Sequence, residues 1–374
     1  MTRTRTRRDD TDVTKQGEFA ETLAQVEKRY GHQAVRKAFE VKQPERISTG
    51  SFMLDFALLG GIPVGRISMV IGNKSSGKSM IANKIIANAQ RKWPDKTPVL
   101  IDVEKTFEPR WAAKLGVNIQ KLPVIEADTG EMAVDLADAM LGTLETSLVV
   151  VDSLAALLPN READSSAEDS HVGLQSRLIG SMCRKLNAGM IKERMRGHAV
   201  TVLFLNQYRT KIGVMKGDPR TAPGGLAVEY FPSLTFQMKN KETMGKDEDT
   251  EVESVIENEH AFKIEKNKLN PGPRTGIFRL VRVPRESEHL DEGDIDDSKT
   301  MLTYAKKFGV FSGGGKYWTL KFEDQEHKFE GGVTSAQLAL NSDRALYQSL
   351  YNWLIREQAI HLGMPQDFVD SFEV

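Results

Sequence analysis

A chain of 374 residues is long enough for two domains or one large core, and its formal net charge of -1 at pH 7 excludes a basic field over the whole molecule. Any nucleic-acid site must therefore be a local patch. The single cysteine, Cys183, excludes an internal disulfide and favours a reducing compartment. No apolar run reaches the roughly 20 residues of a membrane span, and no apolar stretch follows the basic start, so we expect a cytoplasmic protein.

The first residues, 1–16, are predicted to be a disordered tail. Residues 17–45 are predicted to form one amphipathic helix and a polar linker, because apolar residues recur there at helical spacing. These are Phe19, Leu23, Val26 and Tyr30.

Between residues 46 and 285, short apolar runs alternate with helical segments. The runs are ISMVI, TPVLIDV, LPVIEA, SLVVVDS and AVTVLFLNQ. This alternation predicts an α/β fold with a mostly parallel sheet and crossover helices. EYFPSLTFQM, HAFKIEKNK and GIFRLVRV are expected to extend the sheet, and MGKDEDTEVESVIENE, residues 244–259, is predicted to be a solvated acidic loop. Residues 286–374 change pattern and predict a small, separate α+β domain.

One motif carries chemistry directly, because GNKSSGKS fills the spacing G-x-x-x-x-G-K-[ST] of a phosphate loop. A strand precedes it and a helix follows it, as a nucleotide site requires. The motif comprises Gly72, Asn73, Lys74, Ser75, Ser76, Gly77, Lys78 and Ser79. Lys78 is expected to reach the β- and γ-phosphates of ATP, and the Ser79 hydroxyl is expected to ligate Mg²⁺. The alternative is a glycine-rich turn with an exposed lysine.

Carboxylates at two other strand ends complete the predicted site. Asp152 ends SLVVVDS, where its buried charge needs a partner such as the water shell of Mg²⁺. Its alternative role is a helix cap. Asp102 and Glu104 both lie near the end of another strand, where ligands of doubly wound sheets gather, and chemistry alone does not choose which of them orients water.

The chain resembles the bacterial RecA recombinases, including their phage-encoded relatives, from about residue 17 to beyond 280. The stretches that carry the resemblance include GNKSSGKS, IDVEKTFEPRWAAKLGV, VVVDSLAALLP, DSHVGLQSRLIGSMCRKL, NQYRTKIGVMKGDP and KNK at 266–268. The resemblance implies a RecA-like ATPase core, an N-terminal oligomerisation helix within residues 17–45 and a helical filament of like protomers.

Roles for several nucleotide-site residues follow from the resemblance. Glu104 matches the glutamate that activates water, and Glu108 and Trp111 match nucleotide contacts, with the aromatic ring stacking on adenine. Taken alone, Trp111 would be a core residue. Lys266 with Lys268 matches the pair that reaches the γ-phosphate of a neighbouring subunit, and without the resemblance both would be surface charges. Gln207 ends a strand within reach of a γ-phosphate and begins the second polar segment, so its position predicts a switch, with a polar strand end as the alternative.

Two polar segments are expected to hold single-stranded DNA. The second, after Gln207, is rich in basic residues that suit a phosphate backbone, whereas the first, residues 160–172, is acidic and alone would be a solvated loop. The resemblance assigns DNA contacts to His171, Val172, Gly173, Arg177, Arg184, Arg209, Lys211, Ile212, Gly224 and Gly225. On composition alone, Arg177 and Arg184 would be solvated helix residues.

These features predict an ATP- and Mg²⁺-dependent recombinase that pairs single-stranded DNA with homologous double-stranded DNA. The alternatives are a hexameric ring translocase or helicase, a scaffold whose ATP site is only a switch, and a small-molecule kinase. Lys74 and Glu229 depart from the family pattern, since bacterial members commonly carry an acid and a lysine there, so coupling between subunits is expected to differ in detail.

Overall fold

The computed structural model describes residues 9–31, 35, 38, 41–163, 173–210, 220–246 and 253–372. Most of the two predicted DNA loops therefore lies outside the described residues. The predicted DNA contacts His171, Val172, Lys211 and Ile212 belong to those segments.

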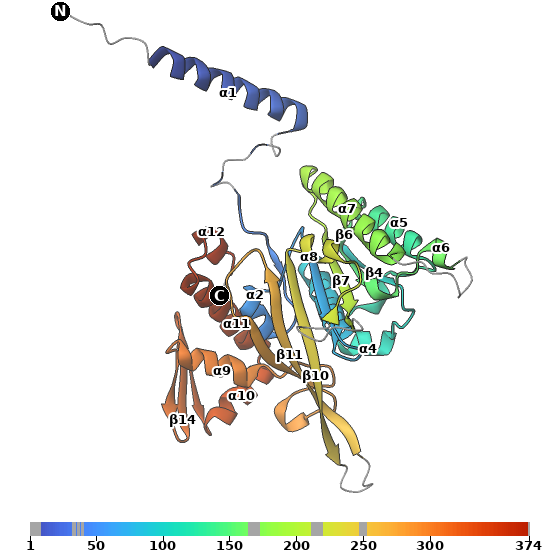
Figure 1. Ribbon diagram of the computed structural model, residues 1–374. Helices are drawn as coiled ribbons and strands as arrows, with labels where there is room; N and C mark the ends of the chain where they lie inside the picture. Colours follow the sequence, from blue (N-terminus) through green and yellow to red (C-terminus); the bar gives the residue numbers. More distant parts are fainter. Residues whose placement is uncertain are drawn as a thin grey trace, which may run out of the picture.

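The N-terminal helix α1, Asp9–Tyr30, stands clear of the rest of the molecule (Figure 1). Its helical backbone begins at Asp9, before the boundary at residue 17 that the apolar spacing suggests. Phe19 and Tyr30 are both exposed in the single chain.

The body of the protein is built on an eight-stranded sheet of order β12-β11-β10-β3-β7-β6-β4-β5. Its strands are β3 Ile67–Gly72, β4 Thr97–Asp102, β5 Val124–Glu126, β6 Thr146–Asp152, β7 Thr201–Gln207, β10 Leu234–Lys246, β11 Glu253–Asn267 and β12 Thr275–Val281. Neighbours from β10 to β5 are parallel, whereas β11 and β12 join antiparallel at one edge. The predicted α/β class and the sheet-extending runs are confirmed.

Helices cover both faces of the sheet, which explains why its central strands are apolar without alternation. In β6, Leu148 and Val150 enter one core, and Val149 and Val151 enter the other. The helices of the body are α2 Phe52–Leu58, α3 Lys78–Lys92, α4 Pro109–Lys114, α5 Gly130–Leu141, α6 Asn160–Ala163, α7 Leu174–Met195 and α8 Leu226–Tyr230. Short pairs β1 Arg46–Ile47 with β2 Ile62–Pro63, and β8 Arg209–Thr210 with β9 Arg220–Thr221, lie outside the main sheet.

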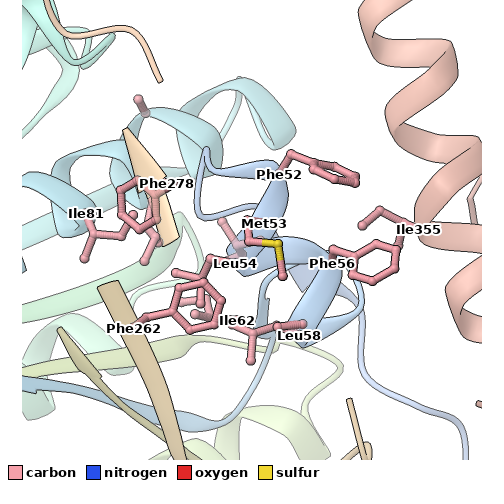
Figure 2. Packing of buried hydrophobic residues seen from close by; sticks show 14 of the residues in the cluster. Phe52, Met53, Leu54, Phe56, Leu58, Ile62, Ile81, Phe262, Phe278 and Ile355 are labelled. Carbon is pink, nitrogen blue, oxygen red and sulfur yellow. The ribbon is translucent and has the colours of Figure 1, made fainter. Parts of the chain in front are cut away.

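The C-terminal residues form a small sheet of three strands with helices packed on one side of it (Figure 1). Its elements are α9 Ser298–Lys307, β13 Phe311–Gly314, β14 Tyr317–Phe322, β15 Gln325–Glu330, α10 Val333–Ser342, α11 Arg344–His361 and α12 Gln366–Val369. This part is not packed separately, because Phe56 of α2 lies 4.3 Å, between ring centroids, from Tyr304 of α9. Figure 2 shows α2 side chains between Phe262 and Phe278 of the main sheet and Ile355 of α11. One hydrophobic core thus joins the two parts.

The segment 244–259 was predicted as an acidic loop, and that prediction is wrong where residues are described. Met244 pairs with Val255 and Lys246 with Glu253, so β10 and β11 run on as a two-stranded ribbon past the end of β3 (Figure 1). Charged side chains can face water on both sides of a ribbon, and the β-branched Val255 and Ile256 favour extended backbone. The acidic charge of this segment therefore predicts its structure less well than its β-branched residues do.

Candidate active site at the carboxyl edge of the sheet

The phosphate loop and the predicted carboxylates meet at one edge of the sheet. Strand register aligns Gly72 of β3 with Gln207 of β7, and Asp102 of β4 with Asp152 of β6. The carboxyl ends of these parallel strands therefore present their side chains to one crevice, where doubly wound sheets bind ligands.

Steric constraints explain why two positions of the phosphate loop are glycine. A Cβ on Gly72 would lie 2.3 Å from the Ser76 Oγ and 2.6 Å from the Met238 carbonyl oxygen. Gly77, the N-cap of α3, has a φ of 92°, in the left-handed region. Because Gly77 has no side chain to cap the helix, the first amides of α3 stay open to an anion.

Lys78 lies largely buried at the start of α3. Its Nζ donates hydrogen bonds to the carbonyl oxygens of Asn73, at 2.8 Å, and Gly72, at 3.3 Å. Burial lowers the pKa of Lys78, and the nearby Asp152 and Glu104 oppose that shift. The ammonium group is thus held within the loop, beside the two carboxylates.

Ser79 and Asp152 form a pair of oxygen ligands suited to magnesium. The Ser79 hydroxyl donates to Asp152 Oδ2 at 2.7 Å. Burial raises the pKa of Asp152 to about 6, the Ser79 bond opposes this, and Glu104 and Asp102 add to it. A desolvated carboxylate beside a hydroxyl fits Mg²⁺, which commonly takes one or two protein oxygens and completes its shell with phosphates and water.

The geometry separates the two carboxylates that the chemistry left undecided. Asp102 is 3% exposed, and its Oδ2 accepts a hydrogen bond from the Phe107 amide at 2.8 Å, so it fixes the loop after β4. Glu104 Oε1 accepts from Gln207 Nε2 at 2.8 Å and from the Ser153 hydroxyl. Glu104 is therefore the carboxylate that meets the end of β7.

Glu108 and Trp111 lie together on α4. Glu108 is the N-cap residue of this helix, and its carboxylate accepts from the amides of Arg110 and Trp111. The Trp111 ring packs partly against the core and carries the Arg282 guanidinium carbon 4.2 Å from its centroid. Both residues thus have structural partners in addition to their predicted contacts with a nucleotide.

The described DNA-site candidates flank this edge. Arg209 is exposed and donates to the Ala155 carbonyl oxygen at 3.1 Å, and Arg177 and Arg184 are exposed on α7. Gly173 and Gly225 are the N-caps of α7 and α8. Gly224 has a φ of 105°, and a Cβ there would lie 2.6 Å from Val228 Cγ1.

Lys266 and Lys268 are not brought to the phosphate loop of their own chain. The Nζ of Lys266 donates to the carbonyls of Glu229 and Tyr230, and that of Lys268 donates to Tyr230 at 3.2 Å. These contacts anchor both lysines at the end of α8.

Sequence reasoning missed two residues close to the site. Ser153 could have been found, because it directly follows Asp152. His260 lies on β11, far along the chain, and no local pattern relates it to the loop. A groove of about 440 Å³ also borders the loop, lined by Asn73–Ser76 and by residues of β10. Asp152 and Glu104 do not line it, so the predicted catalytic groups lie on the other side of the phosphate loop.

Fold and site together define the class of P-loop ATPases with a RecA-like core. Residues 17–282 match the family described as RecA N-terminal domain. The chain is also 39% identical over 291 residues to Protein RecA of Bacillus velezensis, an alignment that covers 77% of this chain and 79% of that protein.

This chain belongs to the RecA family, and its activity is that of an ATP-dependent DNA recombinase with a DNA-dependent ATPase. Members of the family bind ATP with magnesium and assemble on DNA. Among the described residues, no helix is both long and apolar enough to cross a membrane.

Proposed function

We propose that this protein forms a helical filament on single-stranded DNA, with ATP and Mg²⁺ between adjacent protomers, and pairs that strand with homologous double-stranded DNA. In this proposal α1 links protomers, residues 46–285 form the ATPase core, and residues 286–374 are an accessory domain that shares the core of the body. Its single, buried cysteine is compatible with the reducing cytoplasm.

The observation that carries the proposal is the separation of two parts of the site within one chain. Leu234 of β10 is paired with Asn267 and with Ser68, near the start of β3, whereas the phosphate loop begins at Gly72. Four residues of strand span about 13 Å, and β11 lies two strands away from β3, about another 10 Å. A lysine side chain does not bridge that separation, so Lys266 and Lys268 are available to the ATP of a neighbour.

Within one protomer, the remaining groups have distinct tasks. The α3 amides and Lys78 bind the phosphates, and Ser79 with Asp152 holds the cation, which offsets phosphate charge when it is bound. Glu104 orients the attacking water and accepts its proton as the water oxygen bonds to the γ-phosphorus and the bond to ADP breaks. The neighbour's lysines stabilise the charge on the transferring group.

Gln207 supports a link between nucleotide and DNA. Its side chain donates to Glu104, and the chain continues directly into Arg209 and the basic segment 211–219. We infer that occupation of the γ-phosphate position alters the Glu104–Gln207 contact and thereby the DNA-binding segment.

The test combines strand exchange with electron microscopy on single-stranded DNA. The expected result is ATP-dependent exchange of homologous strands and open helical filaments. Closed rings that unwind duplex DNA would instead indicate a translocase. ATP-dependent filaments without DNA-stimulated phosphate release would indicate a scaffold.

A further inference from the structure

His260 of β11 lies directly beneath the phosphate loop. A Cβ on Gly77 would lie 2.5 Å from the His260 Cε1 and 2.7 Å from its Nδ1, so the imidazole fills the space behind this glycine. The ring is 3% exposed and packs on Phe278, with 5.2 Å between ring centroids. The main sheet thus supports the loop through one polar side chain.

The ring lies against Gly77, and the Ser76 backbone is the polar loop group beside it. Burial lowers the pKa of His260 to about 4, the Ser76 backbone opposes this shift, and Arg282 adds to it. An interaction that favours the protonated ring is one with an acceptor, which on a backbone is the carbonyl oxygen. At neutral pH the ring is uncharged, so one nitrogen carries a proton that it can donate.

The polar atoms behind the loop are not fully satisfied. Among the residues that the structure describes, neither ring nitrogen of His260 has a hydrogen-bond partner of normal geometry, and neither does the buried Ser76 Oγ. A buried polar group without a partner costs about 1–3 kcal/mol. A loop conformation that brings the Ser76 carbonyl onto the ring would recover part of that free energy.

Phosphate binding depends on how the peptide units of the loop are oriented. Lys78 Nζ donates to the carbonyl oxygens of Gly72 and Asn73, which leaves its third N–H for a phosphate oxygen. A carbonyl that turned toward the phosphates would repel them, whereas amides that face them attract them.

We propose that His260 is a positioning residue of the nucleotide site, whose ring N–H holds the Ser76 carbonyl behind the loop so that the amides of Gly77 and Lys78 face the phosphates. This inference rests on the proposed nucleotide site. The ring touches neither substrate nor cation, so it acts on nucleotide affinity through the loop.

Isosteric pairs of variants test the hydrogen bond apart from packing. His260→Asn places an amide near the position of Nδ1, and His260→Leu has the same shape without a donor. His260→Gln and His260→Met form the equivalent pair for Nε2. The probe is a fluorescent, non-hydrolysable ATP analogue with Mg²⁺, and KM and kcat for ATP are measured beside it.

In at least one pair, the amide variant is expected to bind the analogue about tenfold more tightly than its apolar twin. KM should follow that difference, while kcat stays within about twofold. Equal affinity of the twins in both pairs would overturn the proposal, since shape alone would then explain the ring. All four variants are checked for folding by thermal melting. If a member of one pair fails to fold, the comparison within the other pair decides the test.

His198 provides the matched control. It is also a buried histidine, but its Nε2 lies 3.1 Å from the Thr143 carbonyl oxygen, away from the loop. His198→Leu and His198→Asn should leave the nucleotide affinity unchanged. Failure of the proposed function would appear differently, as absence of analogue binding by the unaltered protein.

Discussion

At the scale of single residues, Asp102 and Glu104 show what side-chain chemistry alone leaves undecided. Both are carboxylates near the end of one strand, and their chemistry is the same. The family resemblance selects Glu104, and the fold gives the physical reason, because Asp102 accepts a loop amide and Glu104 meets Gln207 from another strand. The phosphate loop was predictable because its residues are contiguous, whereas His260 was not, because its contact with Gly77 depends on the arrangement of the sheet.

Glu104→Gln should abolish ATP hydrolysis while nucleotide binding remains. The amide keeps the shape of the carboxylate but does not accept the proton of the attacking water, so phosphate release should fall by a factor of about 10² or more. Asp102→Asn is the matched control, because its amide oxygen can still accept from Phe107. Comparable losses in the two variants would contradict the assignment of Glu104.

Arg209→Ala should weaken binding to single-stranded DNA and reduce its salt dependence. If Arg209 contacts one phosphate, the log–log slope of affinity against salt should decrease by about 0.7. Fluorescence anisotropy over a salt series measures this slope. Lys121→Ala, which removes an exposed positive charge elsewhere, should leave it unchanged, and an unaltered slope in Arg209→Ala would mean that this guanidinium does not meet the DNA backbone.

At the scale of elements, the junction between α2 and α9 depends on a buried carboxyl group. Asp297, the N-cap of α9, is 1% exposed, and its Oδ2 accepts from the Phe52 amide at the start of α2. Burial raises the pKa of Asp297 to about 8, two backbone amides oppose this, and Asp55 and Asp296 add to it. The folded protein therefore holds this proton more tightly than the unfolded chain does.

Asp297→Asn should make the stability of the protein less sensitive to a rise in pH between about 4 and about 8. Since the pKa is raised in the folded state, the unaltered protein loses stability as pH rises from about 4 to about 8, and the effect is constant above that. The variant should gain stability relative to it across this window, by an amount on the order of a few kcal/mol at pH 8. Urea unfolding at pH 5, 7 and 9 measures the difference, with Asp291→Asn as an exposed control. A constant difference across the window would rule out this role of Asp297.

The helices and strands agree with the sequence prediction where one pattern of apolar residues dominates, and they differ from it where charge and strand propensity conflict. The parallel strands were predicted because their apolar runs alternate with helices. The β10–β11 ribbon was not predicted, because its acidic residues obscured the strand pattern of Val255 and Ile256. The shared core of α2, α9 and α11 was not predictable either, since contacts such as Phe56 with Tyr304 join distant parts of the chain.

At the scale of the whole molecule, the proposed site is completed only by a second copy of the chain. A protein with Lys266→Ala and Lys268→Ala, and a protein with Glu104→Gln, should each be nearly inactive. In a mixed filament, a lysine-deficient protomer keeps its own Glu104 and can receive lysines from a Glu104→Gln neighbour. Random equal mixing should repair roughly a quarter of the sites, because each junction needs a particular order of two protomers.

DNA-dependent phosphate release of the mixture, compared with the sum of the separate proteins, measures this repair. Recovery above the sum is the expected result. If mixed filaments form and no ratio gives recovery, the lysines act within their own subunit or have no role in hydrolysis.

If the lysine pair completes the site of a neighbour as proposed, a filament has two unlike ends, because the phosphate loop and the lysine pair lie at opposite ends of the parallel strands. At one end the last protomer offers lysines that no nucleotide receives, and at the other the last phosphate loop has no donor beyond it. A filament of n protomers therefore contains n minus one complete sites. Turnover per protomer should rise with the length of the DNA strand that limits n and then level off, and nucleotide should persist unhydrolysed at one terminus.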